Sequence, residues 1–332
     1  MARPKEASAR AGGIGEPVGL SDDRLRDMYY KMLVARLLGD RMFILNRQGR
    51  AHFAITGHGH EACQVGSAFA LRAGRDWVLP YYRDMGVVLA LGMTTREVML
   101  HFLARAADPC SGGRQMPNHW GYPSLRIVTG SSVVATQIPH AVGVALASKL
   151  RAEDDVSIVY FGEGATSQGD FHEGLNFASV HRLPVVFFCE NNGYAISEPQ
   201  WKEMAVPNVS DRARGYGLCG STVDGNDALA VYQTTRWAVG ECRHGRGPSL
   251  SRPRPIAWCP TPAPTTTAAT AAAPSWRSGR RRTPWIAFAP TWRSTASWTK
   301  QAPKPCAPAL RPRSRTLSNT LRASPSRPPR RR

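Results

Sequence analysis

The sequence predicts an α/β fold in which a parallel sheet carries helices on both of its faces. Two short apolar runs, at residues 156–161 and 185–189, have the continuous hydrophobic character of strands that are covered on both sides. An amphipathic stretch at residues 170–181 separates them, which indicates a strand–helix–strand unit. Because each run ends in a cluster of polar residues, the unit also predicts a ligand site at one edge of the sheet.

The composition divides the chain near residue 245. Residues 243–332 contain 19 of the 43 Lys and Arg residues and no Asp or Glu, whereas residues 1–242 are formally neutral. We therefore expect a flexible N-terminal tail at residues 1–20, a folded domain at residues 21–250 and a disordered basic tail rich in Pro and Arg at residues 251–332.

Several classes of protein are excluded by simple patterns. No apolar run approaches the roughly 18–20 residues that a membrane helix needs. The first 20 residues contain no hydrophobic stretch typical of a secretory signal, and the seven cysteines form no CxxC pair. We therefore expect a cytoplasmic protein that has no disulfide framework and does not bind a membrane.

The other elements follow from caps and periodicity. Ser21 precedes apolar residues at helical spacing, which predicts a helix to about Gln48 with Gly49 as its stop. Thr94 and Glu97 form a capping box for a helix that reaches about residue 105. Weaker patterns predict helices at residues 60–72, 136–151 and 227–242 and a strand at residues 77–81.

The polar residues after the two central strands are oxygen ligands. Glu163 lies between two glycines, which lets a ligand approach the backbone closely at the start of a helix whose N-terminal amides favour an anion. Asn191 and Asn192 follow the second strand. One carboxylate, amide or backbone carbonyls and phosphate oxygens make a normal octahedral shell for Mg²⁺. These residues predict a magnesium–diphosphate site, and they leave open a nucleotide-binding sheet of another kind.

The motifs around these residues resemble one family. FGEGATSQGDFHEGLNFA (161–178) and FFCENNGYAIS (187–197) are similar to the alpha subunit of the thiamine-diphosphate-dependent decarboxylating component of 2-oxo acid dehydrogenase complexes. YYRD, GRQMPNHWG and SSVVATQIPHAVG, at residues 81–84, 113–121 and 131–143, occur in the same order. The resemblance covers residues 20–250 and implies the thiamine-diphosphate-binding fold.

The resemblance implies a role for each residue that matches a family motif. Glu163, Asn192 and the backbone carbonyl of Tyr194 would bind Mg²⁺. The other implied cofactor contacts are Tyr82, Arg83, Ser132, Val134, Gly164 and Ala165. A potassium-binding loop of some members matches Ser131, Val133, Thr136 and Gln137. Some relatives carry Arg at the position of Glu190, so that Glu190 either leaves a contact to the diphosphate missing or faces elsewhere.

The activity implied by the resemblance is the oxidative decarboxylation of a 2-oxo acid, with acyl transfer to the lipoyl group of a partner acyltransferase. A beta subunit is the second implied partner, because the family's site lies between the subunits of an α2β2 heterotetramer. GRQMPNHWG and ENNGYAIS look most like the branched-chain, or 2-oxoisovalerate, type. Pyruvate and acetoin dehydrogenases are alternatives, and a non-enzymatic metal- or nucleotide-binding regulator is an alternative of another class.

The residues after Leu250 depart from the family pattern. Relatives continue into a Tyr-Arg pair and a loop with a His that helps the chemistry, so the catalytic residues of this chain stay unknown. We hypothesise that the tail is read in a shifted frame, because one shift can turn the codons of residues 252–257 into Glu-Ala-Lys-Thr-Tyr-Arg. A chain of this kind would have low or no activity. The alternative is a basic arm that binds nucleic acid electrostatically.

Three histidines flank the motif-bearing loops. We interpret His58, His60 and His119 as hydrogen-bonded structural residues rather than proton shuttles.

Overall fold

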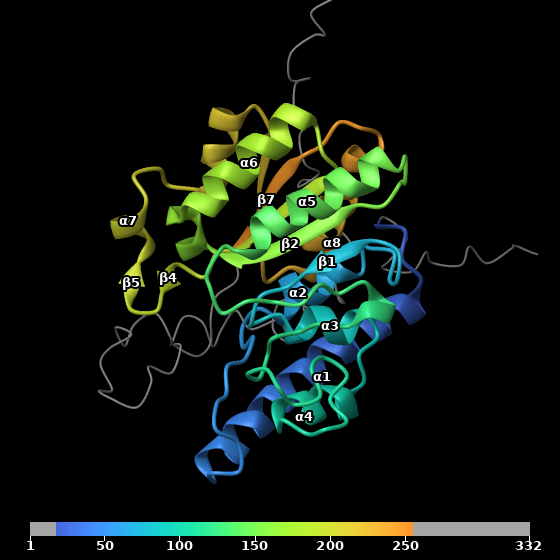
Figure 1. Ribbon diagram of the computed structural model, residues 1–332, viewed down its shortest axis with the longest axis vertical. Coiled ribbons are helices and arrows are strands. Elements are labelled where there is room, and N and C mark those ends of the chain that lie inside the picture. Colours follow the sequence, from blue (N-terminus) through green and yellow to red (C-terminus); the bar gives the residue numbers. More distant parts are fainter. Residues whose placement is uncertain (1–17, 255–332) are drawn as a thin grey trace, which may run out of the picture.

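The computed structural model describes residues 18–254, and five strands form its main sheet (Figure 1). The sheet order is β1-β2-β3-β7-β6, and every neighbouring pair is parallel. The strands are β1 (Trp77–Leu79), β2 (Ser157–Gly162), β3 (Val185–Glu190), β6 (Cys219–Asp224) and β7 (Ser249–Arg254). The predicted parallel sheet is confirmed, and its two central runs are neighbours.

Helices cover both faces of the sheet, as predicted. On one face, α5 (Gln137–Leu150) and α6 (Gly169–His181) pack on Val159, Phe161 and Phe187. The opposite face packs through Ile158, Tyr160 and Phe188 on a second group of helices. That group comprises α1 (Asp22–Arg47), α2 (Glu61–Ala68), α3 (Met85–Leu91), α4 (Thr95–Phe102) and α8 (Ala228–Arg243). Alternate residues of β2 and β3 therefore enter opposite cores, as the period of a strand requires.

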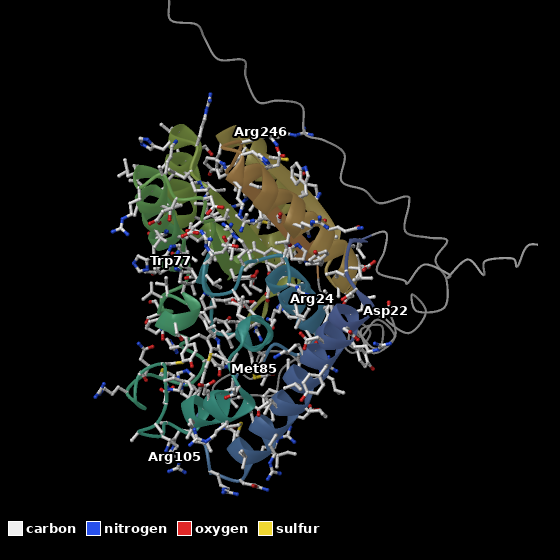
Figure 2. The ribbon with its side chains drawn as sticks, turned by 90° about the vertical axis from the view of Figure 1, so that its right-hand side faces the viewer. Asp22, Arg24, Trp77, Met85, Arg105 and Arg246 are labelled. Carbon is white, nitrogen blue, oxygen red and sulfur yellow. The ribbon has the colours of Figure 1, made fainter. Side chains whose placement is uncertain are left out.

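A third apolar cluster joins the start of α1 to α8. Leu25 of α1 packs with Leu229 and Tyr232 of α8, and the cluster also includes residues of α2 such as Val65. Figure 2 shows the start of α8 close to Asp22 and Arg24, with its far end near Arg246. Within residues 18–254, no helix combines the length and the apolar character that crossing a membrane requires.

Local capping signals explain where two helices begin. The Ser21 side chain accepts the N–H of Arg24 at 3.3 Å, so α1 starts where the sequence indicates. In α4, the Thr94 hydroxyl accepts the N–H of Glu97 at 3.2 Å, and the Glu97 carboxylate accepts the N–H of Thr94 at 2.8 Å. The predicted capping box is confirmed.

Several elements differ from the sequence prediction. α2 ends at residue 68 instead of 72, α4 ends at residue 102 instead of 105, and α3 was not predicted. The prediction also missed β6 and β7, and β7 extends four residues past the expected boundary at residue 250. The short elements are β4 (Tyr194–Ala195), β5 (Glu198–Pro199), α7 (Gln200–Glu203) and three 3₁₀ turns at Pro123–Leu125, Glu163–Ser167 and Val209–Tyr216. The expected tails at residues 1–17 and 255–332 lie outside the described residues.

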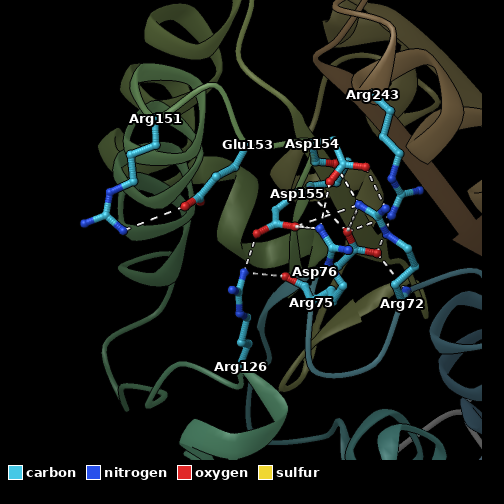
Figure 3. Close-up of polar contacts among 10 residues, drawn as sticks. Arg72, Arg75, Asp76, Arg126, Arg151, Glu153, Asp154, Asp155 and Arg243 are labelled. Atoms are coloured by element: carbon cyan, nitrogen blue, oxygen red, sulfur yellow. Dashed lines mark hydrogen bonds and ion pairs between the residues drawn. The ribbon is translucent and has the colours of Figure 1, made fainter.

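A group of ion pairs lies at the amino-terminal ends of β1 and β2 (Figure 3). The Asp76 carboxylate is buried and accepts hydrogen bonds from the Arg243 guanidinium and from the N–H of Val156 at 3.1 Å. Asp155 pairs with Arg126. These ion pairs lie at the amino-terminal edge of the parallel sheet, whereas the predicted ligand site lies at the carboxyl-terminal edge. We therefore interpret the group as structural.

Gly66 offers a direct test of the packing between α2 and α8. A Cβ at Gly66 would lie 2.5 Å from the carbonyl oxygen of Ala228, so Gly66→Ala must push the two helices apart. We expect the free energy of unfolding to fall by about 1–3 kcal/mol. Gly240→Ala is the matched control, because nothing lies within 4 Å of its Cβ, and it should be neutral or stabilising by up to about 1 kcal/mol. Urea unfolding measures both, and equal destabilisation would contradict this packing.

Candidate metal and diphosphate site

Three neighbouring strands end at the same edge of the sheet and are followed by polar side chains. Arg83 follows β1, Glu163 follows β2 and Asn192 follows β3. Gly162 pairs with Glu190 across β2 and β3, and the backbone N–H of Asn192 donates to Oε2 of Glu163 at 3.3 Å. The structure therefore brings together the two side chains from which a magnesium site was predicted.

Glu163 is buried, and one of its carboxylate oxygens lacks a partner. Within residues 18–254, Oε1 of Glu163 accepts no hydrogen bond. Burial raises the pKa of Glu163, while hydrogen bonds from its own backbone N–H and from the N–H of Asn192, together with the charge of Arg83, oppose the rise. A buried carboxylate oxygen without a donor costs free energy, and a bound cation would remove that cost. The unpartnered oxygen and the hard oxygen donors around it fit Mg²⁺.

Asn192 is held in one orientation by contacts on both sides of its amide. Its Oδ1 accepts the N–H of Tyr194 at 3.0 Å, and its Nδ2 lies 3.3 Å from Nε2 of His60. The Tyr194 ring is exposed, which is compatible with a role for its backbone carbonyl alone.

The turn after β2 passes close to the turn after β3. A Cβ at Gly164 would lie 2.7 Å from Cβ of Ala195, so this position requires glycine. Ala165 is buried beside it. A 3₁₀ turn (Glu163–Ser167) separates β2 from α6, which begins at Gly169 and confirms the helix predicted at residues 170–181. Tertiary contact with Ala195 explains the glycine, which the sequence alone attributed to a ligand.

Arg83 provides a fixed positive charge near Glu163. The guanidinium lies over the Tyr82 ring, with its carbon 5.3 Å from the ring centroid, and Nη1 donates to the carbonyl of Thr56 at 3.2 Å. Its positive charge offsets part of the rise that burial causes in the pKa of Glu163, so the two groups interact electrostatically. A buried guanidinium in this position suits the contact to a diphosphate that the sequence predicts.

The loop at residues 131–137 forms hydrogen bonds of its own. The Ser132 hydroxyl bonds to Nε2 of His119 at 2.6 Å, and the Ser131 hydroxyl accepts the N–H of Val133 at 3.1 Å. The Gln137 amide donates to the carbonyl of Tyr160 at 3.0 Å. Cofactor contacts by Ser132 and Val134 stay predictions, as does potassium binding by Ser131, Val133, Thr136 and Gln137.

A buried network behind the site was missed by the sequence analysis. Oε2 of the fully buried Glu190 lies 2.7 Å from Nδ1 of His60 and accepts from Nε2 of Gln64 and from the Tyr81 hydroxyl, both at 3.1 Å. Glu190 therefore faces α2, which answers the question that the sequence left open. The spacing of His60 and Gln64 on one helical face is the local signal that could have indicated the network.

Asp84 adds a second buried carboxyl group, hydrogen-bonded to Glu190. Burial, followed by the charge of Glu190, raises the pKa of Asp84 well above its usual range. The raised pKa favours a protonated Asp84, which can donate to Glu190 and so relieve the repulsion between two adjacent carboxylates.

Known proteins are similar to this chain in sequence. The family described as dehydrogenase E1 component matches residues 29–251. The 2-oxoisovalerate dehydrogenase subunit alpha of Bacillus subtilis is 57% identical over 235 residues, which cover 71% of each chain. The chain belongs to the dehydrogenase E1 component family. This membership confirms the family that the motifs indicated.

Two further comparisons cover a smaller share of the matched protein. The pyruvate dehydrogenase E1 component subunit alpha of Bacillus cereus is 40% identical over 70% of this chain, and the chain spans 59% of that relative's length. A solved structure described as a putative thiamin diphosphate-dependent enzyme isolated from Mycobacterium smegmatis is 21% identical, with a TM-score of 0.40. The match covers 59% of this chain and 31% of that chain, a likeness too low to bear on the assignment.

Asp84→Asn tests the protonated state of Asp84. Because the folded chain keeps a proton that the unfolded chain releases above its ordinary pKa of 3.8, the stability of the unmodified chain falls as pH rises above that value. Asn can donate to Glu190 without titrating, so we expect the variant to gain stability relative to the unmodified chain from about pH 5 to about pH 8. Urea unfolding at both pH values measures this gain. The exposed Asp27→Asn is the control, and a stability difference for Asp84→Asn that does not change with pH would contradict the assignment.

Proposed function

We propose that this chain is the alpha subunit of a branched-chain 2-oxo acid dehydrogenase and that its site binds Mg²⁺ and thiamine diphosphate. The observation that carries the proposal is the buried Glu163 carboxylate, whose unpartnered oxygen lies at the strand end beside Asn192. Identity to the 2-oxoisovalerate dehydrogenase subunit, at 57%, exceeds the 40% to the pyruvate dehydrogenase subunit, which supports the branched-chain type.

The residues at the strand ends suggest how the cofactor would be held. Glu163, the side-chain oxygen of Asn192 and the carbonyl of Tyr194 would bind Mg²⁺, and Arg83 would donate to the diphosphate. Thiamine diphosphate, when bound, supplies the nucleophilic carbon and the electron sink needed to decarboxylate a 2-oxo acid. The remaining proposed contacts are Tyr82, Ser132, Val134, Gly164 and Ala165.

Exposed apolar side chains on the loops near the site support a protein partner. Val133, Ile196 and Trp201 are 66%, 73% and 75% exposed. Val133 lies in the loop before α5, Ile196 follows β4 and Trp201 lies in α7, and a chain on its own gains nothing from exposing such large apolar groups. We propose that a beta subunit covers this rim in an α2β2 assembly and that a lipoyl acyltransferase accepts the acyl group. A cytoplasmic location and a potassium ion at residues 131–137 belong to the same proposal.

The shifted-frame hypothesis for the tail is supported by two boundaries that nearly coincide. The family match ends at residue 251, and no Asp or Glu occurs after residue 241. Sequencing the source DNA across the codons for residues 247–260 tests the hypothesis, and one missing or extra base is the expected result. An intact frame would favour the basic arm, whose binding to nucleic acid should weaken steeply with salt and disappear on truncation after residue 254.

Glu163→Gln should separate stability from cofactor binding. Without ligands, the variant should be more stable by about 1 kcal/mol, because it buries no unpaired charge. With Mg²⁺ and thiamine diphosphate at 100 times their dissociation constant, the unmodified chain and its beta subunit should gain about 2.7 kcal/mol and the variant little. Thermal unfolding with and without ligands measures both effects. The exposed Glu173→Gln is the control, and equal ligand stabilisation in all three proteins would contradict the site.

Carbon dioxide release tests the reaction and the substrate. We expect the chain as printed to release little or none with its beta subunit, because the family's His loop is missing after Leu250. A chain with the restored frame should decarboxylate 3-methyl-2-oxobutanoate faster than pyruvate. The reverse preference would favour a pyruvate dehydrogenase, cofactor binding without any carbon dioxide from the restored chain would favour a non-enzymatic regulator, and full turnover by the printed chain would contradict the role given to the loop.

A further inference from the structure

His60 connects the buried Glu190 to the proposed metal ligand Asn192. We infer that His60 is a positioning residue, which orients the Asn192 amide so that its oxygen can bind Mg²⁺. The inference rests on the proposed function, because it assumes that Asn192 is a ligand. It adds a role for a residue that lies more than a hundred positions away from its two partners in sequence.

The backbone fixes the place of the His60 ring. His60 occupies the N-cap position directly before α2, and its N–H donates to the carbonyl of Gly57 at 2.8 Å. The side chain is fully buried, with Nδ1 2.7 Å from Oε2 of Glu190 and Nε2 3.3 Å from Nδ2 of Asn192. Each ring nitrogen therefore has one polar partner, and the two partners come from the end of β3.

The chemistry of these partners determines which way the Asn192 amide points. Nδ1 of His60 faces a carboxylate, so Nδ1 carries the proton and donates. In the neutral ring Nε2 then accepts, and only the amide NH₂ of Asn192 can donate to it. The amide oxygen must consequently turn to the other side, where it accepts the N–H of Tyr194 at 3.0 Å. A carbonyl oxygen has two lone pairs, so one remains for a cation.

Glu190 is itself held from behind by other elements. Gln64 of α2 and Tyr81, which follows β1, donate to Oε2 of Glu190, and Asp84 is hydrogen-bonded to the same carboxylate. The orientation of Asn192 therefore depends on a series of buried hydrogen bonds that runs through Glu190 and His60. Outer contacts of this kind, in which a histidine and a carboxylate orient a ligand, typically change metal affinity by about 10- to 100-fold when removed.

Three substitutions of His60 distinguish orientation from mere packing. His60→Leu removes both contacts. His60→Asn keeps a donor near the Nδ1 position but is too short to reach Asn192. His60→Gln keeps one donor and one acceptor and can span both partners. The matched control is His101→Leu, because His101 is also buried and bonded to a carboxylate, Asp108, at 3.1 Å.

Mg²⁺ is titrated into the full chain, which is purified with its beta subunit and saturated with thiamine diphosphate. Calorimetry measures the binding of Mg²⁺. We expect His60→Leu and His60→Asn to weaken Mg²⁺ binding by about 10- to 100-fold. His60→Gln should stay within about threefold of the unmodified protein, and so should His101→Leu. Circular dichroism of each variant shows whether it is folded, and His60→Asn carries the test if His60→Leu is not.

The outcomes separate this inference from the proposed function. Mg²⁺ affinity in His60→Asn equal to that of the unmodified protein would overturn the positioning role and leave the metal site intact. A loss in His60→Gln as large as in His60→Asn would also overturn it, because the hydrogen-bond pattern would then be irrelevant. If the unmodified protein shows no binding that depends on Mg²⁺, the proposed function fails and this inference fails with it.

Discussion

Glu163 and Asn192 lie side by side because β2 and β3 pair in parallel with Gly162 opposite Glu190. Side chains alternate along a strand, so a shift of one residue would exchange the faces of Tyr160 and Phe161. Each face packs in its own apolar cluster, and the cost of exchanging them holds the register. The register in turn places an acidic strand end beside an amide-rich one, and the rest of the site is built around that contact.

The contact between these strand ends buries charged groups, and burying a charge costs free energy. Glu163, Asp84 and Glu190 are all buried. Burial raises the pKa of Asp84, and Oε2 of Glu190 accepts hydrogen bonds from His60 and Gln64, although its Oε1 has no partner among the described residues. Glu163 keeps one oxygen without a partner within residues 18–254. A site that binds a cation has to tolerate such a group in the absence of ligand, so stability is sacrificed locally for binding.

Local signals explain which parts of the fold could be predicted from the sequence. The apolar runs of β2 and β3 and the capping box at Thr94 each depend on a few neighbouring residues, and these predictions are confirmed. β7 was missed although it is a central strand, because Ser249, Ser251 and Arg252 give it no apolar pattern. The bond between His60 and Glu190 joins residues 130 positions apart, so only the tertiary structure reveals it.

The central claim is that Glu163 and Asn192 bind a divalent cation together. The most direct test is a crystal structure of the chain with its beta subunit, grown with thiamine diphosphate and with Mn²⁺ in place of Mg²⁺. The anomalous signal of Mn²⁺ locates the ion without reference to the protein. We predict one peak in contact with the Glu163 carboxylate, the Asn192 side-chain oxygen and the Tyr194 carbonyl. Thiamine diphosphate bound with the ion elsewhere, or with Glu163 turned away from it, would contradict the account.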